Sequence, residues 1–342
     1  MPSAKMSGIA ATLYMGNMMH TKLGVRGVFG RGRAFQGLNT DPSALKGRVV
    51  LVTGGTGGIG RAAAAQLARM GAEVHIVGRN EQKGNAAIEE MNRELKDAAP
   101  DVQFHRVDLS KLSSTRDFAR RFASEVLGED RSLDVLINNA AVMPPAHSLA
   151  DENGGHEMAL STNLLSWYIL SNHLAPRITA KDGKIITVVS AGMKLFKLHP
   201  DELRSLDEAE GKAYDGVKSY SITHRARVLL TKRWAQQKPG LTTATVHPGW
   251  VDTPGLSSAK QMRGFYKTMK GMLRTEDEGA DTIVWLAASP NEKISSGKYY
   301  RDRKVRGIDF ALAGTSATEK EVDALESMVK ELTSSYLPEA KL

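Results

Sequence analysis

Short apolar runs alternate with amphipathic stretches along most of the chain, beginning at about residue 48. The run RVVLVTG is rich in β-branched residues and ends in glycine, and the Ala-rich stretch GIGRAAAAQLARMG follows it. The first pattern predicts a buried strand, and the second predicts a helix closed by a glycine C-cap. Because this pair repeats, the pattern predicts a parallel sheet covered by helices on both faces.

The same alternation of apolar runs and amphipathic stretches predicts the later strands and helices. Strands are expected over 72–78, 102–108, 133–140, 183–190, 241–249 and 296–302, and helices over 80–97, 113–127, 156–178 and around 214–218. Two capping boxes, Thr275 with Glu278 and Ser316 with Glu319, predict helix starts in the last third. We therefore expect one doubly wound α/β Rossmann domain with a parallel sheet over 47–312, an N-terminal arm over 1–46, and a C-terminal helix and tail over 313–342.

Charge and composition narrow the class of protein. The 342 residues are 41% hydrophobic and 25% charged and include no cysteine, which excludes disulfides and thiolate chemistry. No apolar run approaches the ~18 residues of a membrane span. Five basic and no acidic residues lie within 1–40, so the rest of the +8 chain is nearly balanced. Near-equal numbers of basic and acidic residues outside 1–40 do not favour nucleic acid as a partner. A protein that binds nucleic acid through the N-terminal arm stays a rival hypothesis.

Both ends of the chain carry targeting patterns. The Arg-rich, acid-poor beginning resembles a mitochondrial transit peptide, with an arm lying over the domain as the alternative. The chain ends in Ala340, Lys341 and Leu342, close to the Ser-Lys-Leu peroxisomal address. We expect a peroxisome-like organelle and its import receptor as a partner, with cytoplasm or mitochondrion as alternatives.

A glycine-rich turn, TGGTGGIG over residues 53–60, lies directly after the first strand and before the first helix. Glycines let the backbone approach a pyrophosphate closely, and the helix N-terminus adds amide donors. This placement predicts a dinucleotide site. The expected cofactor-binding residues in this turn are Thr53, Gly54, Gly58, Ile59 and Gly60.

The end of the second strand bears on which dinucleotide is bound. An acid there favours NAD, whereas Arg can pair with a 2′-phosphate. The sequence has Gly78 and Arg79, with no carboxylate before Glu81. We therefore favour NADP(H) and leave NAD(H) open. Asp108, followed by Leu109, is placed to bind the adenine or to cap a helix, and Asn138 ends the fourth strand as a further binding candidate.

Three features suggest a reacting centre. Ser190 ends a strand at the carboxyl edge, where doubly wound sheets place ligands. Asn163 lies within an apolar helical stretch, where asparagine is disfavoured. Tyr214 and Lys218 have the i, i+4 spacing of one helix face. A lysine there would stabilise the phenolate, lower the tyrosine pKa and make it useful for proton transfer. An exposed, unreactive pair is the alternative.

Taken in order, these motifs resemble the short-chain dehydrogenase/reductase superfamily over about residues 46–312. The resemblance implies that Tyr214 is the general acid/base, that Ser190 binds the substrate oxygen, and that Asn163 supports a proton-relay water. It also implies that Lys218 holds the nicotinamide ribose, that Asn138 contacts the ribose region, and that the loop of Pro248, Gly249, Val251 and Thr253 meets the nicotinamide.

The expected function is hydride transfer between a nicotinamide and a carbonyl or alcohol of a small apolar substrate, and a homo-oligomer is left open as the state of assembly. The alternative is a non-catalytic dinucleotide sensor. The sequence departs from the family in the length between Ser190 and Tyr214, where an insertion begins apolar and turns acidic. We expect this insertion to lie beside the substrate pocket, as a lid does.

Overall fold

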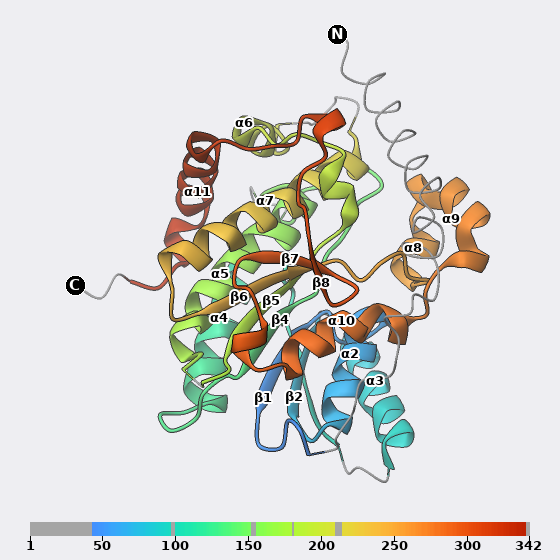
Figure 1. Cartoon of the computed structure of the whole chain (residues 1–342), viewed down its shortest axis with the longest axis vertical. Coiled ribbons are helices and arrows are strands. Elements are labelled where there is room, and N and C mark those ends of the chain that lie inside the picture. Colours follow the sequence, from blue (N-terminus) through green and yellow to red (C-terminus); the bar gives the residue numbers. More distant parts are fainter. Residues whose placement is uncertain (1–42, 97–99, 152–154, 180, 209–213, 340–342) are drawn as a thin grey trace.

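The computed structural model describes residues 43–96, 100–151, 155–179, 181–208 and 214–339. Within these ranges, eight strands form one sheet with the order β3-β2-β1-β4-β5-β6-β7-β8 (Figure 1). The strands are β1 (Val49–Thr53), β2 (Glu73–Gly78), β3 (Asp101–Arg106), β4 (Val135–Asn138), β5 (Lys184–Val188), β6 (Thr242–Val246), β7 (Lys298–Arg301) and β8 (Lys304–Arg306). Neighbouring strands are parallel except β7 and β8. The predicted α/β fold is confirmed.

Helices cover both faces of the sheet (Figure 1). One layer holds α2 (Gly58–Arg69), α3 (Glu81–Glu94) and α10 (Glu276–Ala288), and the other holds α4 (Leu112–Arg121), α5 (Ser166–Leu174) and α7 (Gly216–Gln237). The remaining α-helices of the described ranges are α6 (Pro200–Arg204), α8 (Pro254–Ser258), α9 (Arg263–Met269) and α11 (Glu319–Thr333).

Strand β1 shows why its sequence is a continuous apolar run. Val50 and Val52 belong to the core under α2 and α10, whereas Val49 and Leu51 belong to the core under α5 and α7. Successive side chains of a strand point to opposite faces, so a strand covered on both faces needs apolar residues at every position. The order of the strands reverses between β1 and β4. Open α/β sheets place their ligands at such a reversal.

The last third of the chain differs from the prediction in two details. The capping box of Thr275 and Glu278 begins α10 as expected. The box that begins α11 is Thr318 with Glu321, two residues after the predicted pair of Ser316 and Glu319. Both pairs satisfy the Ser/Thr-x-x-Glu pattern, so spacing alone did not separate them. The second difference is β8, an unpredicted strand that pairs antiparallel with β7 through a two-residue turn.

No helix in the described ranges is long and apolar enough to cross a membrane. Residues 1–42, which include most of the predicted arm, lie outside the described residues. The same is true of the C-terminal tripeptide, residues 340–342.

Candidate active site

The glycine-rich turn joins β1 to α2. Gly54 has a φ of 66°, a left-handed conformation that favours glycine. A Cβ on Gly60 would lie 2.3 Å from the carbonyl oxygen of Gly54, so the first helical turn packs directly on the backbone of the loop. Helix α2 begins at Gly58 and has neither a side-chain cap nor an acidic residue in its first turn. Such a terminus suits an anionic ligand.

Thr53, the last residue of β1, and Asn139, the residue that follows β4, together fix the shape of this turn. The Thr53 hydroxyl oxygen accepts hydrogen bonds from the amides of Asn139 and Ala140, both at 3.0 Å. The Asn139 side chain donates to the carbonyl oxygens of Thr53 at 3.0 Å and Gly54 at 3.3 Å. The side chain facing the turn is therefore Asn139.

Asn138 points the other way. Its amide donates to the Ser171 hydroxyl on α5 at 3.1 Å and is buried. The expectation that the Asn138 side chain meets the ribose is not supported by this placement, because neighbouring residues of a strand face opposite sides of the sheet. The backbone oxygen of Asn138, unlike its side chain, contacts α7: it accepts a hydrogen bond from Arg227 at 2.8 Å.

The end of β2 lies directly against the glycine-rich turn. A Cβ on Gly78 would approach the Thr56 methyl to 2.7 Å, and Arg79 follows with an exposed side chain. No ion pair with Arg79 is formed within the described ranges. Asp108 accepts hydrogen bonds from the amide and hydroxyl of Ser110 at 3.0 and 2.7 Å, so it closes a local turn. Leu109 packs in the core.

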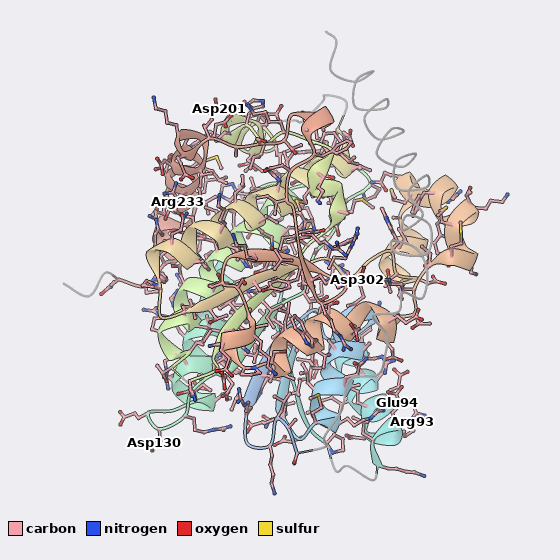
Figure 2. All side chains as sticks on the ribbon, in the orientation of Figure 1. Arg93, Glu94, Asp130, Asp201, Arg233 and Asp302 are labelled. Carbon is pink, nitrogen blue, oxygen red and sulfur yellow. The ribbon has the colours of Figure 1, made fainter. Side chains whose placement is uncertain are left out.

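The loop after β6 closes over the glycine-rich turn from the other side. The Arg274 guanidinium donates to the Pro248 oxygen at 3.1 Å and to Asp302 (Figure 2) at 2.7 Å, and a Cβ on Gly249 would meet it at 2.7 Å. Val251, which is buried, forms a bridge with Arg274.

Thr253 continues this loop and caps α8 through the amide of Leu256 at 3.2 Å. Its methyl lies 3.7 Å from where a Cβ on Gly58 would stand. The next residue, Ile59, lies 3.3 Å from where a Cβ on Gly279 of α10 would stand. The predicted residues of the turn and of this loop are thus brought together.

Ser190 lies two residues after β5, at the same carboxyl edge of the sheet. Its oxygen accepts a hydrogen bond from the Gly192 amide at 3.2 Å. The tyrosine whose hydroxyl hydrogen-bonds Ser190 is Tyr220, on α7. Both residues are partly exposed. Sequence reasoning missed Tyr220.

Asn163 links this edge to α7. It lies in a π-helical turn over Leu160–Leu165, a distortion that is frequent at functional sites. Its side chain accepts from the Val142 amide at 2.8 Å and donates to the Val142 oxygen at 2.9 Å and to the Thr223 hydroxyl at 3.3 Å. Asn163 therefore positions the loop after β4 against the helix that carries Tyr220.

Tyr214 lies before α7 rather than on it. The helix begins at Gly216, and Asp215 caps it by accepting from the amides of Val217 and Lys218, both at 3.0 Å. The prediction that Tyr214 and Lys218 share a helix face is wrong. The capping preference of Asp, together with the Gly that follows it, places the helix start after Tyr214.

The Tyr214 hydroxyl donates to the buried Glu157 carboxylate at 2.5 Å. The same carboxylate accepts from the Leu160 amide at 2.7 Å and the Ser219 hydroxyl at 3.1 Å. Burial and the hydrogen bond to Glu157 raise the pKa of Tyr214 above its ordinary value. The expectation that Lys218 lowers this pKa is wrong, because Lys218 instead pairs with Glu202 of α6 at 3.2 Å.

Tyr220, His224 and Arg227 form a row on one face of α7, because residues four and seven apart lie above one another. The Tyr220 and His224 rings meet edge to face with centroids 4.2 Å apart. His224 and Arg227 are buried. Burial raises the pKa of Tyr220, while the Arg227 charge and the Ser190 hydrogen bond lower it. Burial lowers the pKa of Arg227 to about 9, which leaves the guanidinium charged at neutral pH.

The described part of the insertion after Ser190 is packed rather than detached. Leu198 and Leu203 are buried in the core, and Arg204 of α6 donates to Glu331 of α11 at 2.8 and 3.2 Å. Residues 209–213 lie outside the described residues. The described part of the insertion is thus anchored to the C-terminal helix.

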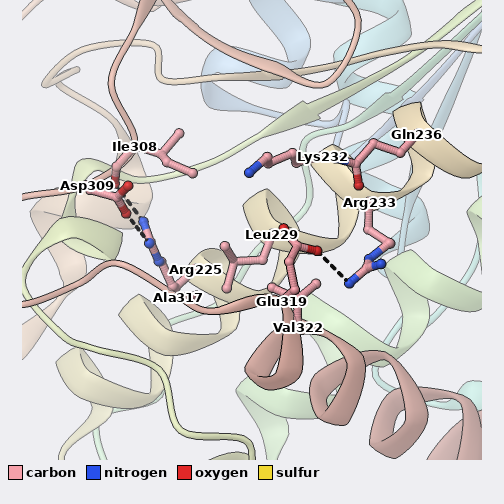
Figure 3. Close-up of a pocket in the computed structure, with 10 residues that line it drawn as sticks. All are labelled: Arg225, Leu229, Lys232, Arg233, Gln236, Ile308, Asp309, Ala317, Glu319 and Val322. Atoms are coloured by element: carbon pink, nitrogen blue, oxygen red, sulfur yellow. Dashed lines mark hydrogen bonds and ion pairs between the residues drawn. The ribbon is translucent and has the colours of Figure 1, made fainter.

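A surface pocket lies on the opposite face of α7, against α11 (Figure 3). Four of its charged groups form two ion pairs: Arg225 contacts Asp309 at 2.5 Å, and Arg233 contacts Glu319 at 3.0 Å. The helix residues that line it are Arg225, Leu229, Lys232, Arg233 and Gln236. Because these residues project away from Tyr220, this pocket is separate from the candidate active site.

Comparisons with known proteins agree with this geometry. The short chain dehydrogenase family profile matches residues 48–197. Dehydrogenase/reductase SDR family member 12 of Bos taurus is 37% identical over 290 residues, which cover 84% of this chain and 87% of that protein. Retinol dehydrogenase 14 of Homo sapiens is 32% identical over 310 residues, covering 84% and 88%.

A solved structure extends the comparison to three dimensions. A protein described as an NAD(P) dependent gluconate 5-dehydrogenase from Beutenbergia cavernae, with NADP bound at low occupancy, is 25% identical with a TM-score of 0.57. The match covers 75% of this chain and 96% of that one. The sequence resemblance is confirmed, and the chain belongs to the short-chain dehydrogenase/reductase family.

Proposed function

We propose that the protein is an NADP(H)-dependent oxidoreductase that interconverts a carbonyl and an alcohol on an apolar substrate, with Tyr220 as the general acid/base. The observation that carries this proposal is the hydrogen bond between Tyr220 and Ser190. This hydrogen bond lies at the carboxyl edge of the sheet. The strand order reverses nearby, between β1 and β4, and open α/β sheets place their ligands at such a reversal. The acid/base role predicted for Tyr214 is reassigned to Tyr220 for this reason.

The residues at this edge suit a nicotinamide dinucleotide. The glycine-rich turn offers a close backbone approach for the diphosphate. Within the described residues, both ring nitrogens of His224 and the Nε and Nη1 atoms of Arg227 are buried without hydrogen-bond partners. Buried polar groups normally have partners, so these atoms are suited to a polar ligand such as a ribose. When bound, the nicotinamide supplies or accepts the hydride.

The protein's own groups handle the proton. In the reductive direction, the Tyr220 phenol donates its proton to the oxygen of the developing alkoxide, and the Ser190 hydroxyl donates a hydrogen bond to the same oxygen. In the oxidative direction, the Tyr220 phenolate accepts the proton from the alcohol. Asn163 acts through position, because its side chain holds the loop after β4 against α7.

Arg79 supports NADP(H) over NAD(H). Its exposed side chain follows β2, where the 2′-phosphate of NADP is bound in dinucleotide folds. The next carboxylate along the chain, Glu81, contacts Arg106 at 3.5 Å. An NAD-preferring site would instead present a carboxylate at the end of β2.

Two observations support an apolar substrate. Trp250, in the loop after β6, packs against Phe265 of α9 with ring centroids 4.4 Å apart, and both rings are partly exposed. The relative named as a retinol dehydrogenase is named for an apolar alcohol. Partly exposed aromatic rings beside a catalytic edge favour an apolar ligand.

A screen of NADPH and NADH consumption over aldehydes, ketones, retinoids and steroids tests the proposal. We expect turnover with NADPH in preference to NADH. Arg79→Glu should reduce or reverse that preference, whereas Arg93→Glu, a matched charge reversal at an exposed position on α3 (Figure 2), should leave it unchanged. Tight NADPH binding without turnover on any compound would favour the rival function, a non-catalytic dinucleotide sensor.

A further inference from the structure

If Tyr220 is the acid/base, the protein lacks the lysine that the family pattern places four residues after the tyrosine. That position is His224, and Lys218 precedes Tyr220 by two residues. The lysine of the pattern has two roles, namely to hold the nicotinamide ribose and to favour the phenolate. Another group must serve these roles if Tyr220 is the acid/base.

His224 does not supply the missing charge. Burial, together with the neighbouring charge of Arg227, holds the pKa of His224 well below its ordinary value. The imidazole is therefore neutral at physiological pH and can only donate or accept hydrogen bonds. Its ring is 2% exposed and lies against Tyr220.

Arg227 lies one helical turn further along the same face of α7. Its side chain is fully buried, and Nη2 is anchored to the Asn138 oxygen at 2.8 Å. The guanidinium also lies over the Trp167 ring at 6.0 Å. Nε and Nη1 keep their hydrogens unpaired within the described residues. A buried guanidinium without a carboxylate partner is costly, so a role toward a ligand explains its retention.

We propose that Arg227 replaces the lysine of the family pattern: its guanidinium holds the nicotinamide ribose hydroxyls and stabilises the Tyr220 phenolate, while His224 serves as a neutral hydrogen-bonding group. This inference rests on the proposed function. Arginine suits the position because its planar fork can keep one N–H on the Asn138 oxygen while others face the ribose.

Few other charges act on this row. The row itself holds the titratable groups Tyr220 and His224, and His247 after β6 faces it. Burial lowers the pKa of His247 to about 3. Within the described ranges, no ion pair joins Arg227 or His224 to a carboxylate. A change of charge at residue 227 should therefore act directly on Tyr220.

The test compares Arg227→Gln, Arg227→Lys and the double variant His224→Lys/Arg227→Gln with the wild-type protein. Arg233→Gln is the control, because it removes a guanidinium from the opposite face of α7. NADPH affinity is measured by fluorescence titration, and the Tyr220 pKa by near-ultraviolet absorbance against pH, with Tyr220→Phe as the blank. Rate against pH is recorded with the best substrate of the screen.

Arg227→Gln should weaken NADPH binding about ten- to hundredfold, as expected for lost hydrogen bonds from a charged group. It should also raise the Tyr220 pKa by about one unit or more, moving the pH profile upward. The double variant should recover much of both losses, because it restores a cation at the family position. Arg233→Gln should change neither quantity.

If Arg227→Gln binds NADPH and titrates like the wild type, the inference is overturned while the proposed function stands. If the wild type neither binds NADPH nor turns over any carbonyl, the proposed function itself fails. Should Arg227→Gln not fold, as melting curves would reveal, Arg227→Lys decides the matter. That variant keeps the positive charge but has fewer hydrogen-bond donors. It should therefore retain the Tyr220 pKa and lose about tenfold in NADPH affinity. Unchanged affinity would count against the inference.

Discussion

Replacing Tyr214 with Phe should destabilise the protein without stopping its chemistry. The change removes the hydrogen bond to Glu157 at 2.5 Å and leaves that buried carboxylate with the Leu160 amide and the Ser219 hydroxyl. A hydrogen bond to a charged group contributes about 1.5–3 kcal/mol. For a domain of this size, about 2 kcal/mol corresponds to a fall in Tm of about 3 °C.

The loss should depend on pH in a defined direction. The pKa of Tyr214 is raised in the folded protein from its ordinary value of 10.0. The stabilisation is therefore fully present below about pH 10 and disappears as the pH rises toward the folded-state pKa. Urea unfolding of wild type and Tyr214→Phe at neutral pH and at stepped alkaline pH measures the difference.

A double-mutant cycle with Glu157→Gln isolates the contact, and its coupling energy should account for most of the loss. Equal stability of Tyr214→Phe and wild type at neutral pH would show that the contact contributes nothing. A stable but inactive Tyr214→Phe would return Tyr214 to the chemistry and refute the reassignment.

Three further substitutions test the site. Lys218→Met should keep kcat and NADPH affinity near wild type, because Lys218 pairs with Glu202; a loss of cofactor affinity would contradict that assignment. Gly60→Ala should weaken NADPH binding by at least about tenfold, because its Cβ would stand 2.3 Å from the Gly54 oxygen, and unchanged affinity in a titration would refute this. Ser190→Ala should lower kcat by about 10²–10³ with NADPH affinity retained, as steady-state kinetics and a binding titration would show; undiminished kcat would exclude a direct role.

Much of the fold and of the candidate cofactor site could be predicted from the sequence. Apolar runs such as that of β1 need both faces covered, and the position of the glycine-rich turn between a strand and a helix indicates a phosphate site. Ser190 and Asn163 were selected as candidates, Ser190 because it ends a strand at the carboxyl edge of the sheet and Asn163 because asparagine is disfavoured within a helix.

The tyrosine that we propose as the general acid/base could not be found from spacing alone. The pattern Tyr-x-x-x-Lys selects Tyr214 and Lys218, whereas Tyr220 is followed at the same spacing by His224. The useful sequence feature was Asp215, whose capping preference starts the helix one residue later and excludes Tyr214 from it. The contact of Tyr214 with Glu157 joins residues 57 positions apart, and no local pattern predicts it.

Asn138 and Asn139 illustrate a second limit. Asn138 ends β4 and Asn139 follows it, and the alternation of side chains sends the first to α5 and the second to the glycine-rich turn. Sequence shows that the two differ in direction but not which one faces the ligand. Sequence analysis did not select the buried Arg227, because an arginine on a helix is usually at the surface.

The most direct test of the central claim is a parallel measurement of kcat and NADPH affinity for Tyr220→Phe and Tyr214→Phe with the best carbonyl substrate. If Tyr220 is the general acid/base, Tyr220→Phe should lose about 10²–10⁴ in kcat with NADPH affinity nearly unchanged, and Tyr214→Phe should turn over near the wild-type rate. Wild-type turnover by Tyr220→Phe, together with its loss in Tyr214→Phe, would contradict the account.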